Sequence, residues 1–282
     1  MMNIIDAVKN FDGQRNRCRN LYLAFGIGAV AILALMGLTG IKFAFIIIPL
    51  ILIVYYVIIK PTFTQYARKW QEYCVQRFME MFEPVTFSYR AKADEIPLLK
   101  EHLLMPEPTK GKLLARCLAT GRCSGIKATA LDATVPVNRG GRTTFVSGCW
   151  LGQTFESTVP ETIYAVKGEM IYNGEYERWL DEQGFKSCSV SAELPEGVVI
   201  YSASGNAELS EDAFALLDRL MRDTSYTAVV KFSRDGLFMF LPHRLLIHQP
   251  PSLKEPITDK TIRQMEFPEI ADAYKLALET KK

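Results

Sequence analysis

The sequence predicts an α+β protein, in which an N-terminal two-helix transmembrane hairpin precedes a cytosolic domain with a mainly antiparallel sheet and flanking helices. Three observations predict this fold class. Residues 21–59 contain two apolar runs interrupted by one short break. From residue 85 onward, short segments of alternating apolar and polar residues indicate β-strands. Amphipathic helical stretches lie between and after those segments, an order typical of α+β domains.

The two apolar runs each have a length that can cross a bilayer. The first, residues 21–40, has no charge, and the second, residues 43–59, is at the short end of the spanning range. A spanning helix needs roughly 20 apolar residues for a hydrocarbon core about 30 Å thick. A signal peptide would not be followed at once by a second apolar run, and the uniformly apolar surface argues against a buried hairpin of a soluble protein. We therefore assign residues 21–60 to a transmembrane helical hairpin.

Basic residues on both sides of the hairpin predict its orientation. Cytoplasmic loops carry the excess of Lys and Arg. The turn between the runs holds only Lys42, whereas basic residues flank both outer ends of the hairpin: Lys9, Arg15, Arg17, Arg19, Lys60, Arg68 and Lys69. We expect both termini and the main domain to be cytoplasmic, with only the turn outside.

Two segments next to the hairpin are predicted to be helical. Residues 1–20 form an amphipathic arm, because Ile4, Ile5, Val8 and Phe11 share a helical face that could lie on the inner membrane surface; a frayed terminus is the alternative. Residues 61–84 form a juxtamembrane helix, with apolar residues at steps of three and four that include Trp70 and Phe78. That stripe packs either on the chain's own domain or on a second protomer.

The remaining residues, 85–282, are assigned to one cytosolic α+β domain with a sub-boundary near residue 170. Residues 94–105 read as a short helix capped by Asp94, and residues 126–137 and 163–166 as strands. Residues 209–223 form an amphipathic helix that begins after Ser210. Asp235-Gly236 closes a hairpin between two apolar runs, which is a strong short-range hairpin signal. Residues 268–279 form the last helix.

Composition limits the classes of function. The formal net charge is +2, and the basic excess lies close to the apolar runs, where anionic lipid explains it without nucleic acid. The six cysteines include no Cys-x-x-Cys pair, and neither a zinc motif nor a glycine-rich phosphate loop occurs. We therefore expect reduced thiols, no metal, no cofactor and no nucleic-acid partner.

Cys149 is the candidate nucleophile for an enzyme. It lies between Gly148 and Trp150, small and aromatic neighbours that some cysteine hydrolases use. Its general base would have to be His102 or His243, which the sequence does not place nearby. The alternative is that Cys149 is a small core residue, as free cysteines commonly are.

Two further groups of residues are candidates for binding. Arg139 and Arg142 flank Gly140-Gly141 and could hold an anion or a lipid headgroup, or simply form a solvated hairpin tip. In the first apolar run, small residues let helices approach closely. They pack either on the second run or on another protein, along a side formed by Gly26, Ala29, Leu33 and Gly37.

Four features appear in an order that resembles a known bacterial family. They are the hairpin at 21–59, Gly148-Cys149-Trp150 in a strand, the strand at 196–202 before a helix, and the hairpin KFSRDGLFMFLP at 231–242. The chain resembles the uncharacterised hairpin-anchored proteins sometimes labelled "galanin", some of which occur beside LemA-type membrane proteins. The family has no established catalytic residues to transfer. The resemblance implies a bacterial inner-membrane protein that works with a second membrane protein.

Three function hypotheses follow from these observations. The leading one is a membrane-anchored interaction or scaffold protein that self-assembles or docks another membrane protein, with the lipid bilayer and a LemA-type protein among its partners. The second is an oligomeric membrane-perturbing or conducting effector with a sensing cytosolic domain, although neither span contains the ionisable residue that transport paths usually show. The third is a membrane-surface enzyme that uses Cys149.

Overall fold

The computed structural model describes residues 3–39, 44–90, 98, 101–102, 104, 114–123, 125–139, 142–167, 175–189, 194–223, 228–263 and 268–281. The chain divides into two compact units. Unit 1 comprises Met1–Arg77 and His248–Glu266, and unit 2 comprises Phe78–Ile247 and Phe267–Lys282. The segment His248–Glu266 is therefore an excursion of the chain from unit 2 into unit 1.

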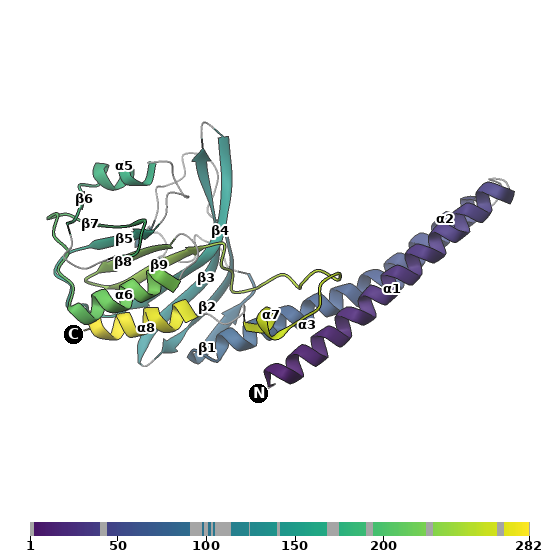
Figure 1. Ribbon diagram of the computed structural model, residues 1–282, viewed down its shortest axis with the longest axis horizontal. Helices are drawn as coiled ribbons and strands as arrows, with labels where there is room; N and C mark the ends of the chain where they lie inside the picture. Colours follow the sequence, from purple (N-terminus) through teal and green to yellow (C-terminus); the bar gives the residue numbers. More distant parts are fainter. Residues whose placement is uncertain are drawn as a thin grey trace. The chain divides into compact units, whose positions relative to one another are not determined.

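Unit 1 is built on two long antiparallel helical stretches (Figure 1). The first is helix α1, Ile4–Thr39, which joins the predicted arm and the first apolar run into one helix. The second consists of α2, Ala44–Val54, a single π-helical turn η2, Tyr55–Ile59, and α3, Lys60–Met79. Aromatic contacts hold the two stretches together: Phe25 lies 6.0 Å from Tyr55, and Tyr22 lies 6.3 Å from Phe63, measured between ring centroids.

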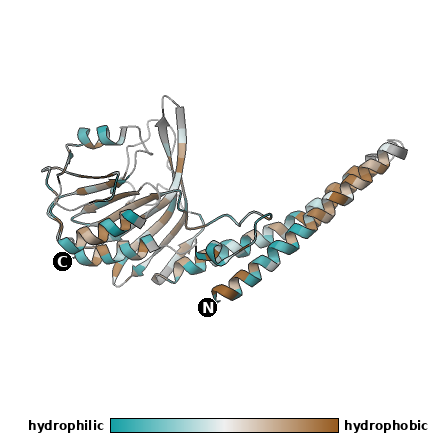
Figure 2. Cartoon of the chain, viewed as in Figure 1, coloured by the Kyte–Doolittle hydropathy of each residue, from teal (hydrophilic) through white to brown (hydrophobic). Residues whose placement is uncertain are grey.

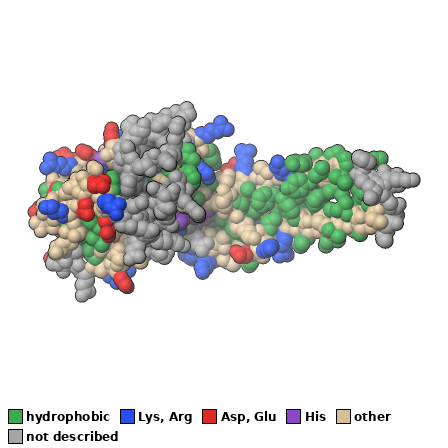
Figure 3. Space-filling model, turned by 90° about the horizontal axis from the view of Figure 1, so that it is seen from above, with side chains coloured by type: hydrophobic (Ala, Val, Ile, Leu, Met, Phe, Trp, Pro, Cys, Tyr) green, Lys and Arg blue, Asp and Glu red, His purple; other side chains and the backbone are tan. Residues whose placement is uncertain are grey.

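These two stretches are long and apolar enough to cross a membrane (Figure 2). In the most apolar window of each, only 6% of the residues are buried, whereas a core helix of a soluble protein would be mostly buried. Hydrophobic side chains cover much of the hairpin in the space-filling view (Figure 3). The predicted turn at residues 40–42 lies outside the described residues.

Unit 2 contains a nine-stranded antiparallel sheet in the order β1-β2-β3-β4-β9-β8-β5-β7-β6. The strands are β1 (Glu83–Ser88), β2 (Leu114–Cys123), β3 (Ile126–Arg139), β4 (Arg142–Thr154), β5 (Ile163–Lys167), β6 (Lys186–Ser187), β7 (Val198–Ser202), β8 (Ala228–Ser233) and β9 (Gly236–Pro242). The predicted α+β class with a mainly antiparallel sheet is confirmed. The predicted helix at 94–105 lies mostly outside the described residues.

Helices cover both faces of the sheet (Figure 1). Helices α6 (Glu211–Asp223) and α8 (Pro268–Thr280) lie on one face, and α5 (Glu175–Glu182) lies on the other. Strand alternation divides the core between the two faces, because successive side chains point to opposite sides. Cys149 and Leu151 therefore pack in the cluster that includes residues of α6 and α8, while Trp150 packs in the cluster that includes residues of α5.

The β8–β9 hairpin forms where the Asp235-Gly236 signal predicts it. Ser233 pairs with Gly236, and the register continues to Val229 and Phe240. Gly236 has a φ of 143°, and a Cβ built there would lie 1.9 Å from the backbone oxygen of Gln153. Only glycine fits this position, because β4 approaches it too closely for any side chain.

Candidate functional site at the base of the hairpin

The base of the hairpin is the part where α1 and α3 bury a common core. Phe11 meets Trp70 edge-to-face with ring centroids 5.2 Å apart, and it lies at the same distance from Tyr73. The Cys18 thiol lies 3.8 Å from the carbonyl oxygen of Thr62. Ala7 is also buried in this cluster, so the N-terminal arm packs on the chain itself rather than presenting this face to a membrane.

The excursion from unit 2 completes this core. We call residues 248–263 the strap; it ends in helix α7, Asp259–Arg263. Leu253, Ile257 and Ile262 join the cluster of Phe11 and Trp70. Hydrogen bonds between Thr258 and Thr261 cap α7, and the hydroxyl oxygens of the two residues are 3.2 Å apart. The strap thus covers the hairpin base with side chains that lie within the predicted cytosolic domain, residues 85–282.

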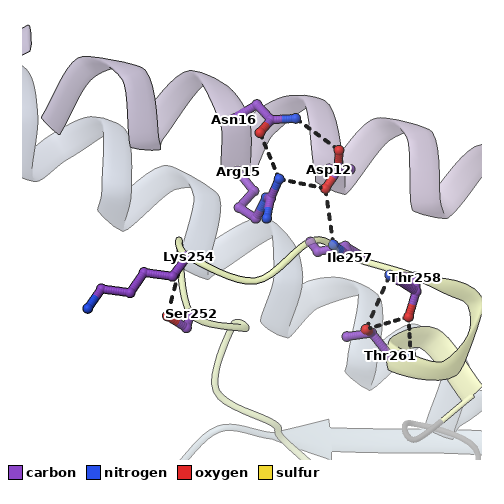
Figure 4. Close-up of polar contacts among 8 residues, drawn as sticks. All are labelled: Asp12, Arg15, Asn16, Ser252, Lys254, Ile257, Thr258 and Thr261. Atoms are coloured by element: carbon purple, nitrogen blue, oxygen red, sulfur yellow. Dashed lines mark hydrogen bonds and ion pairs between the residues drawn. The ribbon is translucent and has the colours of Figure 1, made fainter. Parts of the chain in front are cut away.

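A polar network joins the strap to α1 (Figure 4). The Asp12 carboxylate accepts a hydrogen bond from the backbone N–H of Ile257 at 3.0 Å, and one of its oxygens lies 3.1 Å from Nη2 of Arg15. Nη2 also donates to Oδ1 of Asn16 at 2.7 Å, and Asn16 donates to Asp12 at 2.9 Å. Asp12 therefore orients both the strap and the arginine.

Arg15 differs from the other basic residues around it. Its side chain is only 4% exposed, whereas Arg17, Arg19 and Lys60 are exposed. Sequence analysis counted Arg15 among the flanking charges that predict orientation, and nothing in its spacing reveals that it is buried. The signal that was available is its position four residues after Phe11, which places both on the same side of the helix.

The small-residue side of α1 lies beside the contact with the second helical stretch and is mostly exposed. Gly26 and Gly37 are exposed, as is Leu33, while Ala29 is partly buried. A Cβ added at Gly26 or Gly37 would meet no atom within 4 Å. The structure thus brings the four predicted residues onto one helix side and leaves space beside the two glycines.

Trp70 and Phe78 are covered by the chain itself. Trp70 packs in the hairpin base, and Phe78 is buried in unit 2, where its ring centroid lies 4.9 Å from that of Phe82. These contacts correspond to the alternative in which the helical stripe packs on its own chain.

Cys149 lies in the core of unit 2 next to a buried carboxylate. Its thiol is 3.9 Å from the carbonyl oxygen of Trp150, and burial raises its pKa well above the usual value. A nucleophile needs the thiolate, which this environment disfavours. His102 lies on the other face of the sheet, stacked on Phe238 at 3.6 Å, and burial lowers its pKa to about 4. The described structure therefore does not support a catalytic Cys149.

Asp132 is a buried acid that the sequence analysis missed. It faces Cys149 across β3 and β4, and its carboxylate accepts backbone N–H bonds from Leu246 at 2.6 Å and Ile247 at 3.3 Å. Burial raises its pKa to about 6, while those two hydrogen bonds act in the opposite direction. Asp132 thus holds the chain just before the strap begins.

The two ends of the excursion are joined by a buried ion pair. Arg244, shortly before the strap, lies 3.0 Å from Glu269, shortly after it, and both side chains are mostly buried. No sequence pattern connects these two residues, because they are far apart in the chain and their pairing depends on β9 and α8 meeting.

The predicted anion site at Arg139 and Arg142 cannot be described as a binding site. Arg139 and Arg142 pair across the end of the β3–β4 ribbon, but their side chains and Gly140-Gly141 lie outside the described residues. Among the described residues, no group of three His, Cys, Asp or Glu side chains could hold a metal ion. Comparison with protein-family models, curated proteins and solved structures found no match.

Proposed function

We propose that this chain is a membrane-anchored interaction protein whose helical hairpin self-associates or docks a second membrane protein. The observation that carries the proposal is the distribution of exposed apolar surface. Most of the large hydrophobic side chains that are exposed lie on the hairpin between Leu23 and Ile58. Soluble monomers rarely expose a continuous apolar surface of this extent, so lipid or another apolar helix is expected to cover it.

The proposed orientation places both termini and unit 2 in the cytoplasm of a bacterium, with the anchor in the inner membrane. Exposed Arg17, Arg19 and Lys60 at the base of the hairpin support it, because positive charge gathers on the cytoplasmic side. Tyr56, whose ring lies 5.0 Å from the Lys60 ammonium, fits the headgroup level at which aromatic rings collect.

The side of α1 that carries Gly26, Leu33 and Gly37 is the proposed contact with another helix. Tyr22 and Phe25 pack on the second stretch, and Gly26, Leu33 and Gly37 lie beside this contact and are exposed. Small residues let a second backbone approach closely, and the open space beside Gly26 and Gly37 leaves room for it. A second copy of the chain is one occupant, and the family resemblance makes a LemA-type protein the first other candidate.

Substitutions at the glycines test this contact. Gly26→Leu and Gly37→Leu would block a close approach, and the Cβ added at either position meets no atom within 4 Å. Gly28→Leu is the matched control, since Gly28 is also open but lies roughly 200° around the helix from Gly26. The measurements are particle mass in nanodiscs and co-purification of partners in mild detergent. We expect Gly26→Leu and Gly37→Leu to reduce association and Gly28→Leu to leave it unchanged.

Two results would remove the proposal. One is a wild-type particle that is monomeric at all lipid ratios, with no partner retained in mild detergent. The other is full recovery of the wild-type chain in the soluble fraction after cell lysis, which would show that the hairpin does not anchor it in a membrane.

A further inference from the structure

Four buried polar atoms at the hairpin base have no hydrogen-bond partner among the described residues. They are Nε and Nη1 of Arg15, the hydroxyl of Tyr66 and Nε1 of Trp70. Tyr66 is 2% exposed and Trp70 is 1% exposed. Native structures pair about nine in ten buried polar atoms, and leaving one unpaired costs roughly 1–3 kcal/mol, or more for a charged group. We therefore expect these four atoms to donate hydrogen bonds to an acceptor.

Helix packing brings the three side chains together. Phe11 meets Trp70, and Cys18 meets Thr62, which fixes the antiparallel register of α1 and α3. Arg15 lies between Phe11 and Cys18 on α1, and Tyr66 lies between Thr62 and Trp70 on α3. Arg15 and Tyr66 consequently share one level of the helix pair, with Trp70 one turn away on the same helix as Tyr66.

The chemistry of this cluster suits an oxyanion. Arginine and indole nitrogens only donate, and the tyrosine hydroxyl can donate as well. Asp12 and Asn16 occupy Nη2 of Arg15. The unpaired Nε and Nη1 lie on opposite edges of the guanidinium, so an oxyanion accepts a hydrogen bond from one of them.

Positive charge lies on exposed side chains at the base of the hairpin. Asp12 compensates the charge of Arg15, but exposed Arg17, Arg19 and Lys60 form no ion pair within the described part of the chain. A metal cation would meet donors and positive charge, so the cluster is unsuited to one.

We propose that Arg15, Tyr66 and Trp70 bind a phosphate-type oxyanion at the base of the hairpin. The oxyanion is either inorganic phosphate or the phosphate of a phospholipid headgroup. Binding of inorganic phosphate goes beyond the proposed function and requires only the residues of unit 1. Binding of a phospholipid headgroup also rests on the proposed membrane anchor.

Cys18 provides a local readout, because it is buried in the same cluster and alkylation requires this core to open. The full-length chain in a maltoside detergent, which lacks phosphate, is treated with N-ethylmaleimide, and Cys18 modification is followed by mass spectrometry. At inorganic phosphate about tenfold above its Kd, alkylation of Cys18 should slow by roughly tenfold at constant ionic strength. Partly exposed Cys188 in unit 2 is the internal reference.

Tyr66→Phe removes only the hydroxyl and keeps the ring in place. If the hydroxyl binds an oxyanion, this variant loses most of the protection by phosphate. Tyr56→Phe is the matched control, since Tyr56 is exposed and remains equally able to contact Lys60 through its ring. Arg15→Met is a second variant, expected to lose protection because it removes the guanidinium donors and their positive charge.

The lipid source is distinguished by adding phosphatidylglycerol or diacylglycerol with the same acyl chains. Protection by inorganic phosphate identifies a free oxyanion, and protection by phosphatidylglycerol alone identifies a headgroup. The proposal is overturned if neither slows the alkylation, or if both slow wild type and Tyr66→Phe equally. A monomeric particle that keeps phosphate protection would count against the proposed function only.

Discussion

At the scale of single residues, Asp132 makes the fold of unit 2 sensitive to pH. Burial raises its pKa to about 6, above the ~3.9 of an exposed aspartate. The folded chain therefore keeps a proton that the unfolded chain releases between about pH 4 and 6. Its contribution to stability is fully present below about pH 4, and the free energy of unfolding falls by up to about 3 kcal/mol as pH rises through 6.

Asp132→Asn should remove this pH dependence, because the amide does not ionise. The measurement is chemical denaturation of the full-length chain in detergent between pH 4 and 7.5. Asp218→Asn is the control, since Asp218 forms a surface pair with Arg222 and its loss should cost less than about 1 kcal/mol. A variant that keeps the wild-type slope would show that another group titrates in this range.

At the scale of elements, the β8–β9 turn depends on a single glycine. Gly236→Ala would place a methyl group against the backbone of β4, and we expect it to lower the free energy of unfolding by roughly 3 kcal/mol or more. Gly125→Ala is the matched control, with a φ of 79° but open space around the added methyl, and should cost about 1 kcal/mol. If thermal or chemical denaturation shows that Gly236→Ala and Gly125→Ala lower the free energy of unfolding equally, the close approach of β4 to Gly236 is contradicted.

The packing of α1 on α3 gives a second prediction for an element. Phe11→Ala removes a buried ring from the contact with Trp70 and should destabilise unit 1 by about 3 kcal/mol. The measurement is the rate of alkylation of buried Cys18 and Cys74, which should rise. Ile5→Ala, an exposed position on the same helix, should leave that rate unchanged. An unaltered rate in Phe11→Ala would argue that the helices do not pack in this register.

Sequence patterns predicted some elements and could not predict others. Asp235-Gly236 identified its hairpin because turn chemistry is local, and the apolar runs identified the long helices because composition alone decides them. The pairing of β4 with β9, and the return of the strap to α1, depend on residues distant in the sequence. The role of Arg15 was missed for the same reason: its partner Asp12 also binds Ile257 of the strap, which is distant in the sequence.

At the scale of the whole molecule, the chain leaves unit 2 at Ile247 and re-enters it at Phe267. Arg244 and Glu269 join the two ends of this excursion. Breaking a buried pair by removing one partner leaves a buried charge and typically costs 3–5 kcal/mol, whereas replacing both with apolar residues costs much less.

Arg244→Met and Glu269→Met should therefore each destabilise unit 2 strongly, and the double variant should recover most of the loss. A double-mutant cycle in chemical denaturation measures this coupling, which we expect to be roughly 2–4 kcal/mol. Arg68→Met with Glu72→Met, an exposed pair on α3, is the control and should show coupling below about 1 kcal/mol. Additive losses at Arg244 and Glu269 would mean that the pair does not act as one unit.

The origin of the strap has a consequence for how the protein is made. The apolar helices leave the ribosome first, yet the residues that cover their base are near the other end of the chain. At translation rates of about 5–20 residues per second, Ile257 is synthesised roughly 10–50 s after Arg15 and Trp70. During that interval the newly made hairpin has an open base, and a nascent chain halted before the strap would keep it open.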